Sequence, residues 1–187
     1  MRMAVVAISF VLITSSSSAA MTQSIQVGGK DGVEYLVPAG SPVKYVSKND
    51  GELQANFHGR FTISGTYYYG TYYAGSMTEA TDDDLDLDFI PDKKFAVTLP
   101  YWRDRGQVHE IEFRNKDAFI NAAIPSSVVR DLKSRKIVSA HGKVSVVIED
   151  YQASVECDAP AYSVTFVSVV HPPTLVLNHN SIEEYTC

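Results

Sequence analysis

The sequence predicts a mainly β protein in which a small antiparallel sheet closes into a barrel. Between residues 56 and 69, Phe57, Phe61, Ile63, Tyr67 and Tyr69 occupy odd positions and mostly polar residues occupy the even ones. Similar alternation recurs further along the chain, and only residues 117–136 have helical character. Because successive side chains of a strand point to opposite faces, this pattern indicates half-buried strands.

Residues 1–20 are predicted to be a cleavable signal peptide. Arg2 is followed by an apolar run from Met3 to Ile13 and by small residues that end at Ala20. About 11 apolar residues are too few to cross roughly 30 Å of hydrocarbon, which disfavours a transmembrane anchor. We therefore expect an exported protein, periplasmic or secreted and bacterial in character, with no membrane insertion after the signal is removed.

Residues 21–51 are predicted to be an N-terminal β extension that packs on the main domain. Its strand-like pieces at 24–27, 33–37 and 43–46 are separated by the glycine- and proline-rich segments GGKDG, PAGSP and KNDG. Such clusters are typical of turns. The sequence leaves open whether this extension completes the barrel or covers one edge of it.

The main domain is predicted to span residues 52–187 and to begin with the alternating strand described above. Gly59 and Gly65 lie on the apolar face of that strand. A strand glycine at such a position usually marks a bulge or a sharp bend, which the closing of a small sheet requires.

The remaining elements follow in an order that specifies the topology. Strand patterns are predicted at 84–89, 95–99, 109–113, 143–151 and 162–170, and short helices at 117–123, with Asp117 as N-cap, and 125–136. With the strand at 56–69, and with residues 95–113 counted as one strand, these are five strands with a helix between the third and the fourth. This is the order of an OB-type Greek-key barrel. An irregular β-sandwich is the alternative, because residues 95–113 can supply one strand or two.

The two cysteines are predicted to form a disulfide bond. Both Cys157 and Cys187 lie in the exported part of the chain, and an even number of cysteines in an oxidising compartment indicates pairing. The bond would close a loop of about 30 residues, pin the C-terminal tail and contribute on the order of 3 kcal/mol.

The charge balance disfavours nucleic-acid binding. The formal net charge of the chain is −6, and an acidic surface repels phosphate backbones. The acidic run at residues 82–88 does not match an EF-hand loop, and its alternation favours a strand with a solvated face. The sequence leaves open whether this run binds a cation. It predicts no catalytic residue, no metal ligand and no cofactor.

Two aromatic clusters form the candidate binding surface, although packing at a structural rim is the competing interpretation. Tyrosine provides a large contact area at a low entropy cost, together with a hydroxyl group that suits a wet boundary. The predicted binding residues are Tyr68, Tyr72, Tyr73, Tyr101, Trp102 and Arg103.

These observations favour a non-enzymatic binding module that contacts a protein partner or a cell-envelope glycan, with an inhibitor as one version. The first alternative is a small hydrolase or metal-dependent enzyme with a dispersed site. Glu110 and Glu112 share one face of a predicted strand and are candidate paired carboxylates, although alternation alone explains them. The second alternative is a structural envelope protein without a ligand.

Overall fold

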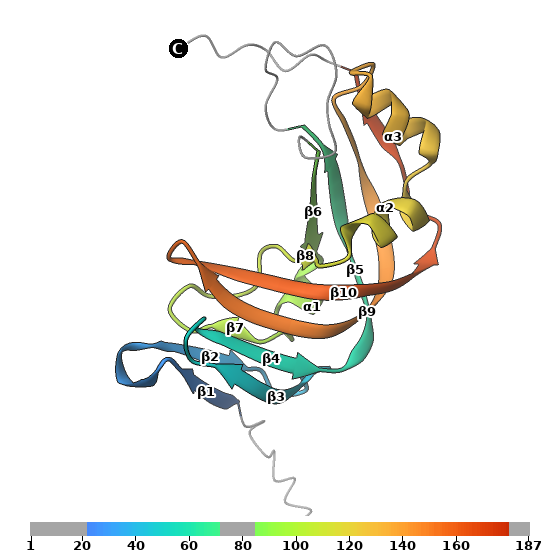
Figure 1. The fold of residues 1–187 in the computed structure, drawn as a ribbon. Helices are drawn as coiled ribbons and strands as arrows, with labels where there is room; N and C mark the ends of the chain where they lie inside the picture. Colours follow the sequence, from blue (N-terminus) through green and yellow to red (C-terminus); the bar gives the residue numbers. More distant parts are fainter. Residues whose placement is uncertain (1–21, 72–84, 180–187) are drawn as a thin grey trace, which may run out of the picture.

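The computed structural model describes residues 22–71 and 85–179, and it is mainly β (Figure 1). The predicted signal peptide lies outside the described residues and remains a prediction. Figure 1 shows a small sheet at the lower end, long curved strands above it, and helix α3 at the upper end.

The small sheet has the order β1–β2–β7 and is antiparallel throughout. Strands β1 (Gln23–Val27) and β2 (Val33–Val37) are joined through a 3-10 turn at Gly29–Asp31 and coincide with the first two predicted strand pieces. Strand β7 (Tyr101–Trp102) comes from much later in the chain.

Strand β9 (Ser139–Glu156) is the centre of the eight-stranded sheet. One of its edges pairs first with β5 (Arg60–Gly70) and then with β4 (Gln54–His58). The other edge pairs with β11 (Val176–Asn178) and then with β10 (Ala159–His171). Strand β3 (Lys44–Asn49) extends the sheet beyond β4.

The predicted strand at residues 56–69 is divided at Gly59, where β4 ends and β5 begins. A Cβ atom at Gly59 would lie 2.6 Å from the Pro42 carbonyl oxygen, so the close backbone approach requires glycine. On the partner strand, Asp150 has a φ of 53° between the part of β9 that pairs with β5 and the part that pairs with β4. The sheet therefore bends at matching positions in both strands.

Strands β6 (Asp86–Pro91) and β8 (Glu112–Phe113) belong to the same sheet. Strand β6 pairs with β5, and β8 pairs in parallel with β10. Between β6 and β8 there is one isolated bridge, Phe89 to Ile111, in which the Ile111 N–H donates to the Phe89 carbonyl at 2.9 Å. The described strands do not close into a barrel, so the mainly β class is confirmed and the predicted barrel is not.

The region between β6 and β8 differs from the predicted strands at 95–99 and 109–113. Residues 93–96 form the short helix α1 (Lys93–Ala96), and only the end of the second segment, β8, is a strand. Pro91 cannot donate to a ladder, and the backbone N–H groups of Phe95 and Ala96 both donate to the Asp92 carbonyl. A turn of helix therefore replaces the expected strand.

The helical connection lies where the sequence predicts it, between β8 and β9. It consists of α2 (Lys116–Ala123) and α3 (Ser126–Lys133). The predicted N-cap, Asp117, is wrong, because it lies inside the first turn of α2 and Asn115 precedes the helix. The Asn115 side chain bonds both the N–H and the carbonyl of Phe166, which holds the start of α2 against β10.

Buried aromatic side chains form two groups in the core. Beneath α2, Phe119 stacks on Phe113 with ring centroids 4.8 Å apart, and Phe166, Phe89 and Tyr67 complete the group. The second group joins the small sheet to the large one. In it, the Tyr151 hydroxyl donates to the Pro100 carbonyl, the Tyr35 hydroxyl donates to the Leu53 carbonyl, and the Trp102 N–H donates to the Tyr162 hydroxyl.

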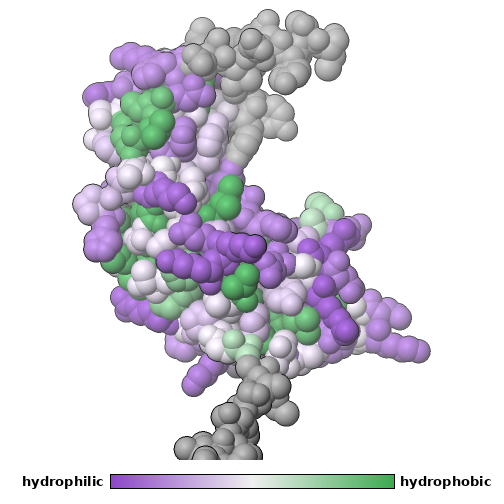
Figure 2. Space-filling model, turned by 180° about the vertical axis from the view of Figure 1, so that it is seen from behind, coloured by the Kyte–Doolittle hydropathy of each residue, from purple (hydrophilic) through white to green (hydrophobic). Residues whose placement is uncertain are grey.

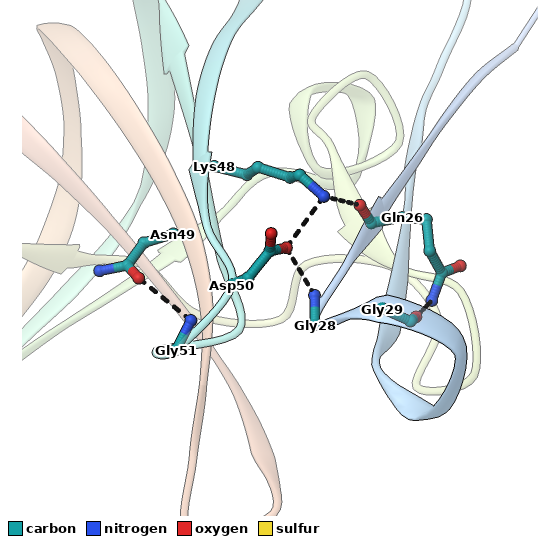
Figure 3. Close-up of polar contacts among 7 residues, drawn as sticks. All are labelled: Gln26, Gly28, Gly29, Lys48, Asn49, Asp50 and Gly51. Carbon is teal, nitrogen blue, oxygen red and sulfur yellow. Dashed lines mark hydrogen bonds and ion pairs between the residues drawn. The ribbon is translucent and has the colours of Figure 1, made fainter.

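A polar network attaches the β1–β2 hairpin to the turn between β3 and β4 (Figure 3). Asp50 accepts a hydrogen bond from the Gly28 N–H at 2.8 Å and forms an ion pair with Lys48 at 2.9 Å. Lys48 also donates to the Gln26 carbonyl at 3.1 Å. All four residues lie within residues 21–51, so this network joins two parts of the predicted N-terminal extension to each other.

Candidate functional site

The outward face of the large sheet carries a continuous row of polar side chains. Ser163 on β10 is paired with Glu112 on β8 and with Gln152 on β9, which in turn is paired with Asn56 on β4. Glu110, Glu112 and Arg114 alternate along the chain and share a face. Pairing between strands that are distant in sequence thus brings these polar residues together.

Four carboxylates gather at one end of this row, and we call Asp88, Glu110, Glu112 and Glu156 the acidic cluster. They come from β6, from the segment that leads into β8, from β8 itself and from the end of β9. Three of them line a hollow of about 350 Å³ beside the β9–β10 hairpin. The hollow is large enough for the end of one basic side chain.

The acidic cluster disfavours its own full ionisation. Although Glu110 reaches solvent, partial desolvation, a hydrogen bond with Asp88 and repulsion by Asp88 and Glu112 raise its pKa to about 7. Desolvation, followed by repulsion from Glu156 and Asp88, also raises the pKa of Glu112. Among the described residues, the charges that raise these two pKa values are those of Asp88, Glu112 and Glu156, so a cation placed here would favour ionisation of both groups.

Tyr68 lies beside the acidic cluster. It is half-buried on the outward face of β5, where the register pairs it with Asp88 on β6 and with His141 on β9. Its ring stacks on the His141 ring, with centroids 6.4 Å apart and planes 16° apart. Tyr67 and Tyr69, on either side of it, are buried in the core.

Arg114 lines a second hollow, on the side away from the acidic cluster. Its guanidinium donates to the Ser163 hydroxyl at 3.1 Å, to the Thr165 hydroxyl at 2.9 Å and to the Asp150 carbonyl. It is therefore held against β9 and β10 rather than turned towards the carboxylates, and partial burial lowers its pKa.

The second hollow has a volume of about 490 Å³ and lies at the bend of the sheet. His58 Nδ1 is 3.0 Å from Asp150 Oδ1, and both side chains are exposed. Among the described residues, His58 has no hydroxyl or thiol partner, so this pair lacks a nucleophile.

A third pocket, of about 610 Å³, lies between α2 and α3. Its lining includes Ile124, Pro125 and Val129 together with the basic Arg130 and Lys133. Among the described residues, no carboxylate or histidine lines it.

Of the predicted binding residues that the structure describes, Tyr68 lies apart from Tyr101, Trp102 and Arg103. Tyr101, Trp102 and Arg103 lie on or next to β7 in the small sheet, whereas Tyr68 lies in the half of β5 that pairs with β6 (Figure 1). Arg103 pairs with Glu34 at 2.6 Å, and Trp102 packs beneath the Arg105 guanidinium. Tyr72 and Tyr73 lie outside the described residues.

The predicted disulfide and the open question of a cation site also involve residues outside the described ranges. Cys157 is exposed in the turn between β9 and β10, and Cys187 lies outside the described residues, so the disulfide remains a prediction. Asp82, Asp83 and Asp84 are also outside them. Within residues 22–71 and 85–179, no group of three or more His, Cys, Asp or Glu side chains is arranged to hold a metal ion.

Exposed large apolar side chains lie on several strands of the described surface, and three of them are the consecutive Leu175, Val176 and Leu177. Val46, Ile90 and Val176 are each more than half exposed, and they belong to three different strands. Figure 2 shows a mainly hydrophilic back face on which hydrophobic patches are small and separate. Recognition by a large apolar surface is therefore not a feature of this face.

Comparison of the chain with protein-family models, with curated proteins and with solved structures found no match. None of the helices in the described part of the chain is long and apolar enough to cross a membrane. The proposed function below therefore depends on the geometry of the site.

The sequence indicates Glu110 and Glu112 as candidate paired carboxylates, but it does not indicate that Asp88 and Glu156 lie beside them. The alternation HEIEFR places both glutamates and Arg114 on one face. Glu156 joins them only because β8 pairs in parallel with β10, which is a contact between segments about 50 residues apart. No local pattern in the sequence specifies that pairing.

Proposed function

We propose that the protein is an exported, non-enzymatic binding module that holds a basic segment of a protein partner against the acidic cluster. The observation that carries the proposal is the gathering of four carboxylates, three of which line one hollow of about 350 Å³ beside the β9–β10 hairpin. A lysine or arginine of the partner would relieve this repulsion, and the relief is the source of affinity.

We also propose that the strands follow an OB-like order, and this order supports the choice of face. Successive pairs run from β9 to β5, β6, β8, β10 and back to β9, with the Phe89–Ile111 bridge standing in for a full ladder between β6 and β8. In OB barrels the second and third strands, which correspond to β6 and β8, form the binding face. A similar fold does not by itself imply a similar function, so the proposed function depends on the acidic cluster.

Tyr68 adds an aromatic surface to the proposed site. Its register position next to Asp88 means that a bound guanidinium can meet a carboxylate and an aromatic face together. Of the binding residues predicted from the sequence, Tyr68 is therefore part of the proposed surface. Tyr101, Trp102 and Arg103 lie elsewhere in the chain and are not part of it.

The proposal is tested by the binding of synthetic peptides to the mature chain, residues 21–187. One peptide is rich in lysine and arginine, and a second has glutamine at those positions. We expect the basic peptide alone to bind and its affinity to fall with added salt. The double substitution Glu110→Gln and Glu112→Gln should raise its dissociation constant about tenfold, as measured by fluorescence anisotropy.

A matched control removes the same charge elsewhere. Asp31→Asn with Glu52→Gln changes two exposed carboxylates outside the acidic cluster and should leave binding unchanged. An equal loss in both double variants would mean that net charge alone attracts the peptide and would refute the site. Binding of neutral envelope glycans, unaffected by Glu110→Gln with Glu112→Gln, would favour the glycan alternative instead.

Single aromatic substitutions decide between the two aromatic clusters. We expect Tyr68→Ala to weaken peptide binding severalfold and Tyr101→Ala to have no effect. The reverse result would move the binding surface to the small sheet.

A further inference from the structure

The contact between β6 and β8 is the weakest link in the large sheet. Strand β5 pairs with β9 over eleven residues and with β6 over six, whereas β6 and β8 share only the Phe89–Ile111 bridge. On the other side, β8 is held to β10 by two residue pairs. Backbone hydrogen bonding across this contact is therefore sparse, and the buried Phe89 and Ile111 side chains supply the rest of it.

The acidic cluster spans this bridge. Asp88 precedes Phe89 on β6, and Glu110 and Glu112 flank Ile111 on the opposing segment. Glu156, at the end of β9, also repels Glu112. Arg114 is the nearest cation along the segment, and its guanidinium is engaged by β9 and β10. Like charges therefore meet across the contact that has the fewest backbone hydrogen bonds.

We infer that the β6–β8 contact is a pH-controlled joint, closed when the acidic cluster holds a proton and loosened when its carboxylates are all ionised. When protonated, Glu110 donates a hydrogen bond to Asp88 across the bridge. When ionised, it repels Asp88 instead. Opening separates Phe89 from Phe113, whose ring centroids are 5.3 Å apart, and gives solvent access to the aromatic core.

The direction of the effect follows from proton linkage. The folded, closed form binds the Glu110 proton more tightly than an ordinary carboxyl group does, because the pKa is raised from 4.5 to about 7. Closure is therefore most favourable below the ordinary value and becomes less favourable as the pH rises towards the raised one. Neutral to alkaline conditions loosen the joint, and mildly acidic conditions tighten it.

Amide hydrogen exchange of the mature chain, without any ligand, tests the joint. The Ile111 N–H donates to the Phe89 carbonyl and reports the bridge, whereas the Arg114 N–H donates to the Val164 carbonyl and reports the other edge of β8. After correction for intrinsic exchange, Ile111 protection should fall about tenfold between about pH 5 and pH 8, while Arg114 protection stays constant.

Glu110→Gln keeps a hydrogen-bond donor opposite Asp88 and removes the titration. In this variant Ile111 should stay protected throughout the same range, whereas Glu52→Gln should behave like the unchanged protein. Wild-type protection of Ile111 that does not vary with pH, or an equal variation in Glu110→Gln, would overturn the inference. If that variant fails to fold, carbon-13 titration of Glu110 in the unchanged protein decides, and an ordinary carboxyl titration refutes the joint.

These measurements need no partner, so their failure is distinct from a failure of the proposed binding function. A protein that binds the basic peptide without any change in Ile111 protection retains the binding site and loses the joint.

Discussion

Gly142 has one of the two closest backbone approaches among the glycines of the described chain. A Cβ atom at this position would lie 1.8 Å from the Thr174 carbonyl oxygen. Thr174 is fixed there, since its N–H donates to the Lys143 carbonyl at 2.9 Å and its carbonyl accepts from the Tyr67 hydroxyl at 3.1 Å. The segment that leads into β11 therefore runs closely along β9 at Gly142, the one residue of β9 without a side chain.

Gly142→Ala should lower the free energy of unfolding by roughly 2–3 kcal/mol, because either β9 or the segment at Thr174 must move. Urea denaturation measures the change. Gly51→Ala is the matched control, since its Cβ atom would lie 3.6 Å from the Asn49 side chain at ordinary contact distance. The control should cost less than about 0.5–1 kcal/mol. Equal costs for both substitutions would contradict this account.

At the scale of elements, the β1–β2 hairpin depends on Asp50 for its contact with the β3–β4 turn (Figure 3). The hydrogen bond from the Gly28 N–H, and then the one from Lys48, lower the pKa of Asp50 below its ordinary value of 3.8. Because the folded state favours the ionised form, this contribution is complete above the ordinary pKa. It is lost as the pH falls through the lowered one.

Asp50→Ala should loosen the hairpin and lower the melting temperature, because the Gly28 N–H and the Lys48 ammonium both lose their acceptor. Limited proteolysis should then cut within residues 28–32 faster than in the unchanged protein. Asp50→Asn retains an acceptor oxygen and should give an intermediate rate. Cleavage at the same rate in all three proteins would mean that the small sheet is held by β7 alone.

Local patterns predicted the elements better than their contacts. Alternation identified β5, β6, β9 and β10, and Gly59 marked the bend that divides β4 from β5. Alternation misled at Phe95, Val97 and Leu99, since three apolar residues in five also fit a turn of helix once Pro91 stops the preceding strand. Register, parallel pairing and the acidic cluster depend on distant segments, which no local pattern encodes.

For the whole molecule, the predicted disulfide is limited by chain length. About nine residues separate Asn178 from Cys187, and they span at most roughly 32 Å when fully extended. Asn178 pairs with Ser139 at the start of β9, and Cys157 follows its end, a path of roughly 60 Å along the strand. The bond within one chain therefore requires the bend of β9 to bring its ends closer together.

The mature protein, denatured without reductant, should show no free thiol and should have the mass of a single chain. Reduction should then lower the free energy of unfolding by about 3 kcal/mol. Two free thiols per chain would refute the disulfide. A covalent dimer that reductant separates would show that the cysteines pair between chains instead.

Strand β9 also determines when the chain can fold during synthesis. It completes the edges of β4, β5, β10 and β11, yet it begins at Ser139. Until residues 139–156 have been made, β5 has only β6 beside it, and the aromatic core beneath α2 lacks a wall. Long-range pairing of this kind delays folding, because the loop must close before the contacts form. About three quarters of the protein must therefore exist as unfinished chain before its core can form, and chaperones would meet it in that state.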